Sequence, residues 1–314
     1  MVEALVAAGI SALLYHLGVG LPLFLIPLQA VRVRRGLRAF VTAAAAALAA
    51  IAGVRLALTG GRPAGETAPF LIMELFVVCA LVGGLAWVQA SRPRLPGGRV
   101  VRLLAAAAVV GLAAIPLARY LAANEAFGQM LRGLFDLLAE GLNRAFGTDG
   151  AAIRGEELAE LTREAFLRSF LLDYLLLLTF GWWAGSRVGA RLAGRPAGVA
   201  RLAEFRMPEG LIWPLIVGLT VVVLSLFVRT GALEFAGWNV LLAMLFFYGL
   251  AGLGILRSLL VRFGLPRAWR TAIAVVLAIL ALTPGVNVAL AVLIPGLGVS
   301  ETWIRYRNME RSEV

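Results

Sequence analysis

Four ionisable side chains lie within or beside long apolar runs, and they are the residues best placed to bind a polar ligand. Arg55 is near the end of one apolar run and Glu74 is near the start of the next, so two antiparallel helices would bring them to the same depth. Arg119 and Asp173 form a second candidate pair, if their helices pack together. An ionised group in hydrocarbon costs at least about 2.5 kcal/mol, so each is expected to have a partner or a purpose. We interpret the four as candidate ligand-binding residues; the alternative for Arg55 and Glu74 is a structural ion pair.

Other residue types that carry chemistry are scarce. His16 is the only histidine and Cys79 the only cysteine, so the sequence predicts neither a zinc site nor a disulfide within the chain. The sequence has no nucleophile elbow, phosphate-binding loop or paired catalytic carboxylates. We therefore expect no catalytic residue, no metal and no cofactor, and an enzyme is the least supported class.

Composition predicts that lipid is the solvent of this chain. Hydrophobic residues make up 61% and charged residues 15%, with a mean hydropathy of +0.89. The formal charge of +11 would also suit a nucleic-acid-binding protein, but the arginines sit in short loops without a basic face of interleaved aromatics. We expect anionic headgroups of the bilayer to be the partner, and not nucleic acid.

Six apolar stretches are long enough to cross about 30 Å of hydrocarbon as helices. They are residues 39–58, 69–90, 101–122, 166–186, 209–228 and 238–258. Residues 2–31 and 270–299 are also apolar but break at Gly18-Val19-Gly20 and Thr283-Pro284-Gly285, so each predicts a pair of short helices that spans thinly or re-enters. The predicted fold is all-α, a polytopic membrane protein with about 8–10 membrane segments in one domain over residues 1–314.

Arginine clusters predict the orientation. They occupy residues 32–38, 92–102, 187–206 and 257–270, and the loops between them carry little net positive charge. Because cytoplasmic loops collect cations, we place these clusters in the cytoplasm of a bacterial cell, together with both termini, and the protein in the inner membrane. If residues 2–31 form one long tilted helix instead, the N-terminus is outside.

Residues 123–168 are too polar to insert and predict an extracytoplasmic amphipathic helical hairpin. Apolar residues recur at helical spacing from Phe127 to Phe146, opposite charged ones. Residues 147–150 supply a turn, and a helix resumes at Glu156. The hairpin is either a lid over a site between helices or a connector that rests on headgroups.

The first helix carries a repeated small-residue ridge formed by Ala4, Ala8 and Ala12. Small residues at this period let another helix approach closely. The ridge is either a docking surface for a separate membrane subunit or ordinary packing within the chain.

Three stretches together resemble the YybS-like family of predicted bacterial membrane proteins of unknown function. They run from Glu204 to Pro214, from Trp238 to Gly252, and from Gly296 to Arg307. Members of this family tend to close on an acidic-aromatic-arginine tail; here Glu301, Trp303, Arg305 and Arg307 stand there without the usual aspartates.

The N-terminal part is also similar to the substrate-binding membrane components of energy-coupling-factor vitamin transporters. The similarity rests on the broken first region, the turn Arg34-Arg35-Gly36-Leu37 and the alanine ridge, which in those proteins docks a coupling subunit. The leading hypothesis is a membrane protein that binds a small molecule for transport. The rival is a non-transporting scaffold or regulatory subunit that docks a partner through helix 1.

Overall fold

The computed structural model describes residues 1–18, 21–58, 64–90, 98–146, 153–196, 202–228, 230–304 and 306–308. Across these ranges the chain forms helices and no strand, which confirms the all-α prediction. The chain separates into two compact units, Met1–Val199 and Ala200–Val314. Two such units can share one bilayer, so a single membrane domain stays a prediction.

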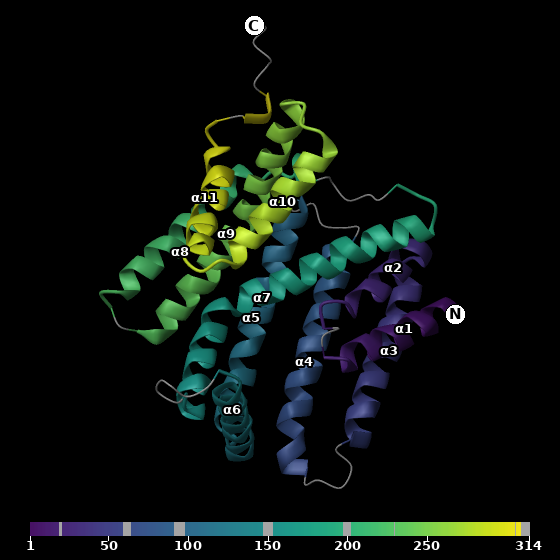
Figure 1. Ribbon diagram of the computed structural model, residues 1–314. Coiled ribbons are helices and arrows are strands. Elements are labelled where there is room, and N and C mark those ends of the chain that lie inside the picture. Colours follow the sequence, from purple (N-terminus) through teal and green to yellow (C-terminus); the bar gives the residue numbers. More distant parts are fainter. Residues whose placement is uncertain are drawn as a thin grey trace, which may run out of the picture. The chain divides into compact units, whose positions relative to one another are not determined.

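The helices of each unit are labelled in Figure 1. Unit 1 holds α1 (Val2–His16), α2 (Leu25–Arg35), α3 (Leu37–Leu58), α4 (Ala64–Val88), α5 (Gly98–Ala122), α6 (Glu125–Phe146) and α7 (Gly155–Leu192). Unit 2 holds the short 3-10 helices η1 (Leu202–Glu204), η2 (Glu209–Leu211) and η3 (Tyr306–Asn308), with α8 (Ile212–Ser225), α9 (Gly231–Arg262), α10 (Arg267–Leu282) and α11 (Val286–Ser300).

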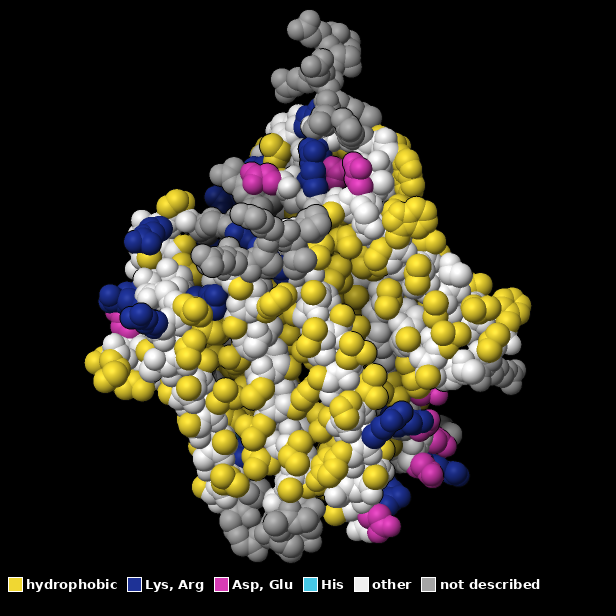
Figure 2. Space-filling model, turned by 180° about the vertical axis from the view of Figure 1, so that it is seen from behind, with side chains coloured by type: hydrophobic (Ala, Val, Ile, Leu, Met, Phe, Trp, Pro, Cys, Tyr) yellow, Lys and Arg dark blue, Asp and Glu magenta, His cyan; other side chains and the backbone are white. Residues whose placement is uncertain are grey.

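Five helices are long and apolar enough to cross a membrane, namely α3, Thr67–Val88 of α4, α5, α7 and α9. Apolar side chains also cover most of the face seen in Figure 2. The protein is therefore a helical membrane protein, and five of the six full-length spans match the prediction.

The sixth predicted span, residues 209–228, forms an α-helix that is too short to cross a membrane. Its helix α8 has 14 residues, which rise only about 21 Å. Pro208 precedes a 3-10 turn at its start, and at its end the Ser225 hydroxyl donates a 2.7 Å hydrogen bond to the Val222 carbonyl. The backbone then continues in i→i+3 turns, with the Leu226 N–H bonded to Val223 and the Phe227 N–H bonded to Leu224, so the α-helix ends before the apolar run does.

The first apolar region folds back on itself. α1 ends at His16, Gly18 has a φ of 68°, and α2 begins at Leu25. The carboxylate of Glu3 accepts hydrogen bonds of 2.9 and 2.7 Å from Arg35, and Arg34 approaches it at 3.4 Å. The start of α1 and the end of α2 therefore lie together, which confirms the predicted break and contradicts one long tilted helix.

α2 packs on a glycine groove of α7 that sequence reasoning missed. A Cβ atom on Gly181 would come within 2.6 Å of the Leu25 Cβ, and one on Gly185 within 2.9 Å of the Ile26 carbonyl oxygen. Beside this contact the buried Gln29 amide donates a 2.8 Å hydrogen bond to Ser186. Glycine lets the two backbones approach, and the polar pair fixes their register.

The alanine ridge of α1 is covered within unit 1. Ala4, Ala8 and Ala12 are 3%, 3% and 7% exposed, and α1 packs against α3 and α2. The ridge is internal packing, because small residues on α1 meet the buried alanines of α3. Their burial favours the alternative of ordinary packing within the chain, and docking of a separate subunit through these three residues stays a prediction. In this conformation a partner of α1 would contact the exposed face that carries Leu5 and Leu13.

The predicted hairpin of residues 123–168 contains α6 and the first part of α7, which pack together. Asn143 donates a 2.9 Å hydrogen bond to the Ile153 carbonyl and accepts a 3.0 Å bond from its N–H, so the two helix ends are tied. α7 then continues without a break to Leu192. The turn at 147–150 lies outside the described residues, and the side of the membrane stays a prediction.

The last apolar region breaks where the sequence predicts. α10 ends at Leu282 and α11 begins at Val286, with Gly285 at a φ of 82° between them. A non-glycine residue would be strained in that conformation. The two helices pack against each other as a short hairpin.

We expect the Gly185→Ala substitution to destabilise unit 1 by about 1–3 kcal/mol, because the added methyl group meets the backbone of α2 and overpacking has costs of this size. Thermal unfolding in detergent measures the effect. Gly83→Ala is the matched control, since a Cβ there meets nothing within 4 Å. Equal melting temperatures for the two variants would contradict the glycine-groove interpretation.

Candidate functional site

Unit 1 contains a cavity of about 930 Å³ between α1, α3, α4 and α6. Apolar side chains form most of its wall, and a small number of polar ones project among them. The lining residues are Tyr15, Leu21, Arg55, Leu56, Leu58, Thr67, Phe70, Leu71, Met73, Glu74, Val77, Ala126, Gln129 and Met130. Apolar walls with few polar groups are typical of small-molecule sites.

The central polar feature of this cavity is an ion pair. Nε of Arg55 lies 2.7 Å from Oε1 of Glu74, and the Tyr15 side chain lines the same cavity, close enough to that carboxylate to interact with it. The Glu74 side chain is 12% exposed and the Arg55 side chain 45% exposed. The predicted pairing of Arg55 with Glu74 is confirmed. Tyr15 lies beside the pair and was missed by sequence reasoning because α1 is far from α4 along the chain.

The start of α6 borders the cavity. The rings of Phe70 on α4 and Phe127 on α6 are in contact, with centroids 4.8 Å apart and planes tilted by 42°, and Phe127 is buried. Gln129 and Met130 of the following turn face the cavity. This aromatic contact holds the amphipathic helix α6 against α4. There α6 covers part of the cavity around Arg55 and Glu74.

Arg119 and Asp173 do not join this site. Arg119 is exposed on α5, and Asp173 accepts a 2.9 Å hydrogen bond from Ser169, one turn earlier on α7. Neither side chain lines the cavity, and no ion pair among the described residues links them. The suggested pairing is wrong, because the serine of α7 satisfies the carboxylate locally.

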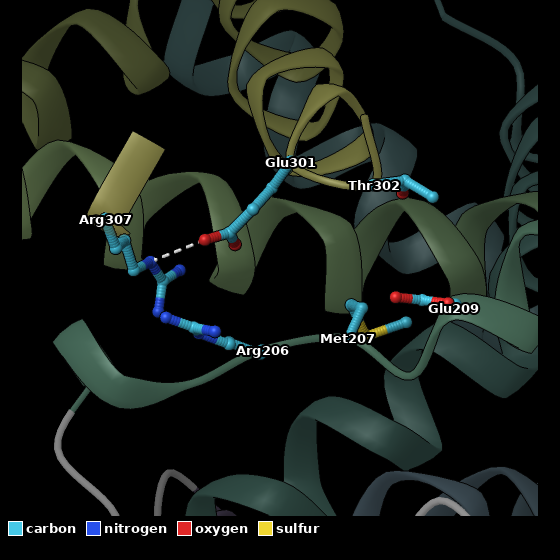
Figure 3. A pocket seen from close by; sticks show the side chains of 7 residues that line it. Arg206, Met207, Glu209, Glu301, Thr302 and Arg307 are labelled. Carbon is cyan, nitrogen blue, oxygen red and sulfur yellow. Dashed lines mark ion pairs between the residues drawn. The ribbon is translucent and has the colours of Figure 1, made fainter. Parts of the chain in front are cut away.

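Unit 2 contains a second polar centre that is almost closed to solvent. Nε of Arg307 lies 2.9 Å from Oε1 of Glu301, and the two side chains are 6% and 13% exposed (Figure 3). The Arg307 guanidinium also donates to the carbonyls of Ala203 at 2.8 Å and Ala251 at 3.2 Å. Burial lowers the pKa of Arg307; Glu301 raises it and Arg206 lowers it. A pocket of only about 100 Å³ remains beside the pair.

The three stretches that carry the YybS-like resemblance meet at this centre. Arg307 comes from the last stretch, Ala251 from the middle one, and Arg206 of the first lies in the same pocket. Close backbone contact brings them together, since a Cβ on Gly252 would meet the Ile294 carbonyl and one on Gly298 the Tyr248 carbonyl. These motifs therefore mark a centre of helix packing and ion pairing. The acidic and arginine residues of the tail indicated this centre in the sequence, but the sequence did not show which residues they contact.

Metal ligands do not gather in the described part of the chain, where no group of three or more His, Cys, Asp or Glu residues could hold an ion. The expected absence of metal and cofactor stays a prediction.

One part of the chain matches a family model of known sequences. Residues 170–294 match a family described as predicted membrane protein, DUF2232. The match extends from within α7 into α11 and stops before Glu301 and Arg307. No curated protein and no solved structure matches the chain. The match supports a membrane protein of unknown function, and the similarity to YybS-like proteins and vitamin-transporter components stays a prediction.

We expect Arg307→Gln to destabilise unit 2 by about 3–5 kcal/mol, because it leaves the nearly buried Glu301 carboxylate without its cation. Hydrogen exchange of α11 measures the loss of protection. In Arg307→Gln/Glu301→Gln part of the protection should return.

The control for this prediction is Arg163→Gln, which breaks an exposed pair with Glu160 whose side chains are 62% and 56% exposed. Exposed ion pairs contribute about 1 kcal/mol or less to stability, so the hydrogen-exchange protection of α7, which carries this pair, should change little. If both single variants behave alike, burial does not govern the Arg307 pair.

Proposed function

We propose that this membrane protein binds a small amphipathic molecule in the cavity between α1, α3, α4 and α6, in the manner of a transporter's substrate-binding component. The observation that carries the proposal is the Arg55–Glu74 pair at 2.7 Å inside a largely apolar cavity of about 930 Å³. A pair that served packing alone would need no such space beside it.

The lining favours a ligand with a zwitterionic or strongly polar end and an apolar body. A ligand cation would approach Glu74, and a ligand anion would approach the half-exposed Arg55. Charge-assisted bonds of this kind contribute about 1.5–3 kcal/mol each. The apolar body would lie along Phe70, Met73 and Val77 of α4, where its burial adds affinity.

Orientation follows from the positive-inside rule. Glu3 and Arg35 mark one end of unit 1, where the arginine cluster of residues 32–38 lies, and Arg55 follows near the opposite end of α3. With the arginine clusters and both termini in the cytoplasm of the bacterial inner membrane, the cavity opens to the outside. In this proposal α6 acts as a lid, anchored by the contact of Phe127 with Phe70.

Substitution of both charged residues, Arg55→Gln/Glu74→Gln, is expected to lower small-molecule retention at least about tenfold, since two charge-assisted contacts are lost. Native mass spectrometry of protein purified without added ligand measures the bound fraction. Tyr15→Phe should have a smaller effect, because it removes one polar hydroxyl from the cavity wall and keeps both charges.

The matched control is Arg119→Gln/Asp173→Asn, which removes the same two charge types outside the cavity. This control should keep wild-type retention. If Arg55→Gln/Glu74→Gln retains its ligand as well as the control does, the cavity is not the binding site.

Orientation is tested on intact cells with a membrane-impermeant maleimide. In a Cys79→Ser background, Glu157→Cys at the start of α7 should be labelled, whereas Arg195→Cys should be labelled only after the membrane is permeabilised. Both side chains are exposed, so access depends on the side of the membrane. Labelling of Arg195→Cys in intact cells would reverse the proposed topology.

A further inference from the structure

A second large cavity, of about 700 Å³, lies in unit 2 between α9, α10 and α11. We propose that it is a binding site for one anionic phospholipid, whose headgroup phosphate is held by Arg257, Arg267 and Arg270 and whose acyl chain fills the apolar part. The site is separate from the Arg55–Glu74 cavity and does not depend on its function.

The three arginines gather at one end of the cavity. Arg257 comes from the last part of α9, and Arg267 and Arg270 come from the first turn of α10. Among the described residues no carboxylate pairs with any of them, although unit 2 pairs its nearly buried Arg307 with Glu301. Nε of Arg270 is buried and has no hydrogen-bond partner in the described part of the chain. The three guanidinium groups have no carboxylate partner among the described residues, and one of them has a buried N–H donor without an acceptor. A phosphate group would supply both the negative charge and the acceptor oxygens.

The N-terminus of α10 adds further positive charge at the arginine end of the cavity. The helix begins at Arg267, so its first N–H groups and the positive end of its dipole lie at the end of the cavity that carries the arginines. An anion there meets guanidinium groups and helix dipole together.

The remainder of the cavity is apolar. Leu253, Leu256 and Leu260 line it from α9, and a stripe that includes Ile273, Leu277 and Ala281 lines it from α10. The distance along α10 from Arg270 to Ala281 is about 16 Å at 1.5 Å per residue, close to half the roughly 30 Å hydrocarbon core. The cavity is therefore about as deep as one leaflet, which suits an acyl chain whose headgroup lies at the membrane surface.

Free phosphate would leave this apolar part without an occupant. A soluble anion can satisfy the three arginines, but the leucine-lined part of the cavity would hold water against hydrocarbon surface, at a cost that grows with the apolar area exposed. A zwitterionic lipid would fill the apolar part but carry a second, positive charge toward the arginines. An anionic lipid satisfies both regions at once.

The test uses purified, delipidated protein in an uncharged detergent, titrated with phosphatidylglycerol or phosphatidylcholine and measured by native mass spectrometry. Wild-type protein is expected to bind phosphatidylglycerol at least about tenfold more tightly, since each arginine near an anionic surface contributes about a factor of five. Arg257→Gln/Arg267→Gln/Arg270→Gln should lose this preference. The variant should fold, because Arg257 and Arg267 are exposed and Arg270 as a whole is only partly buried.

Two controls separate a built site from general attraction. Arg38→Gln/Arg191→Gln/Arg195→Gln removes the same charge from exposed arginines that line neither large cavity, and should keep the preference. Ala274→Phe keeps every charge but fills the apolar part, and should weaken phosphatidylglycerol binding. Loss of preference in the first control to the same degree as in the cavity variant would overturn the proposal.

A competition with inorganic phosphate distinguishes the sources of the anion. Phosphate in large excess should displace little phosphatidylglycerol from the wild-type protein. Ready displacement by phosphate, together with unchanged phosphatidylglycerol binding in Ala274→Phe, would show a soluble-anion site and sink the lipid proposal.

Discussion

Close backbone contact along one long helix organises each unit of this protein. Between helices in lipid the hydrophobic driving force is small, so association depends on packing that lets backbones approach. In unit 1 that helix is α7, which contacts α2, α4, α5 and α6 and receives α2 in its glycine groove. In unit 2 it is α9, which contacts α8 and α11, with Gly252 against the carbonyl of Ile294. Substituting either glycine surface would push apart the helices that pack through it, α2 and α7 in unit 1 and α9 and α11 in unit 2.

The packing of helices within each unit decides how each charged group is satisfied. The folding back of α1 brings Tyr15 to Glu74, and the ordering of α4 beside α3 brings Arg55 to the same carboxylate. In unit 2 the contact between α9 and α11 places Glu301 and Arg307 over the carbonyl of Ala251. A buried charge is costly unless it is paired and hydrogen-bonded, so both pairs depend on helix packing that is already dense.

Much of this fold follows from hydropathy and from glycine and proline positions. The breaks near Gly18 and Gly285 were predictable because a short apolar run with a turn signal cannot continue as one straight helix. The Arg55–Glu74 pair was predictable because both residues lie at matching depth on consecutive helices. The short α8 was not, since hydropathy measures where a run stays apolar and not where the backbone leaves the α-helical pattern. Tyr15 and the α2–α7 groove were missed because they join residues far apart in the sequence, as was the local satisfaction of Asp173 by Ser169.

The three groups of charges differ in how completely each is neutralised, and that difference separates structure from binding. Arg307 is 6% exposed, is paired with Glu301 and also donates to two carbonyls, so little capacity remains for a ligand. Arg55 is paired but 45% exposed beside a large cavity, so its partner can be exchanged for a ligand group. The arginines at 257, 267 and 270 have no carboxylate partner among the described residues and stand over an apolar cavity. Because an unpaired cation gains most from an added anion, affinity for anions should increase in that order, from the closed pair to the open cluster.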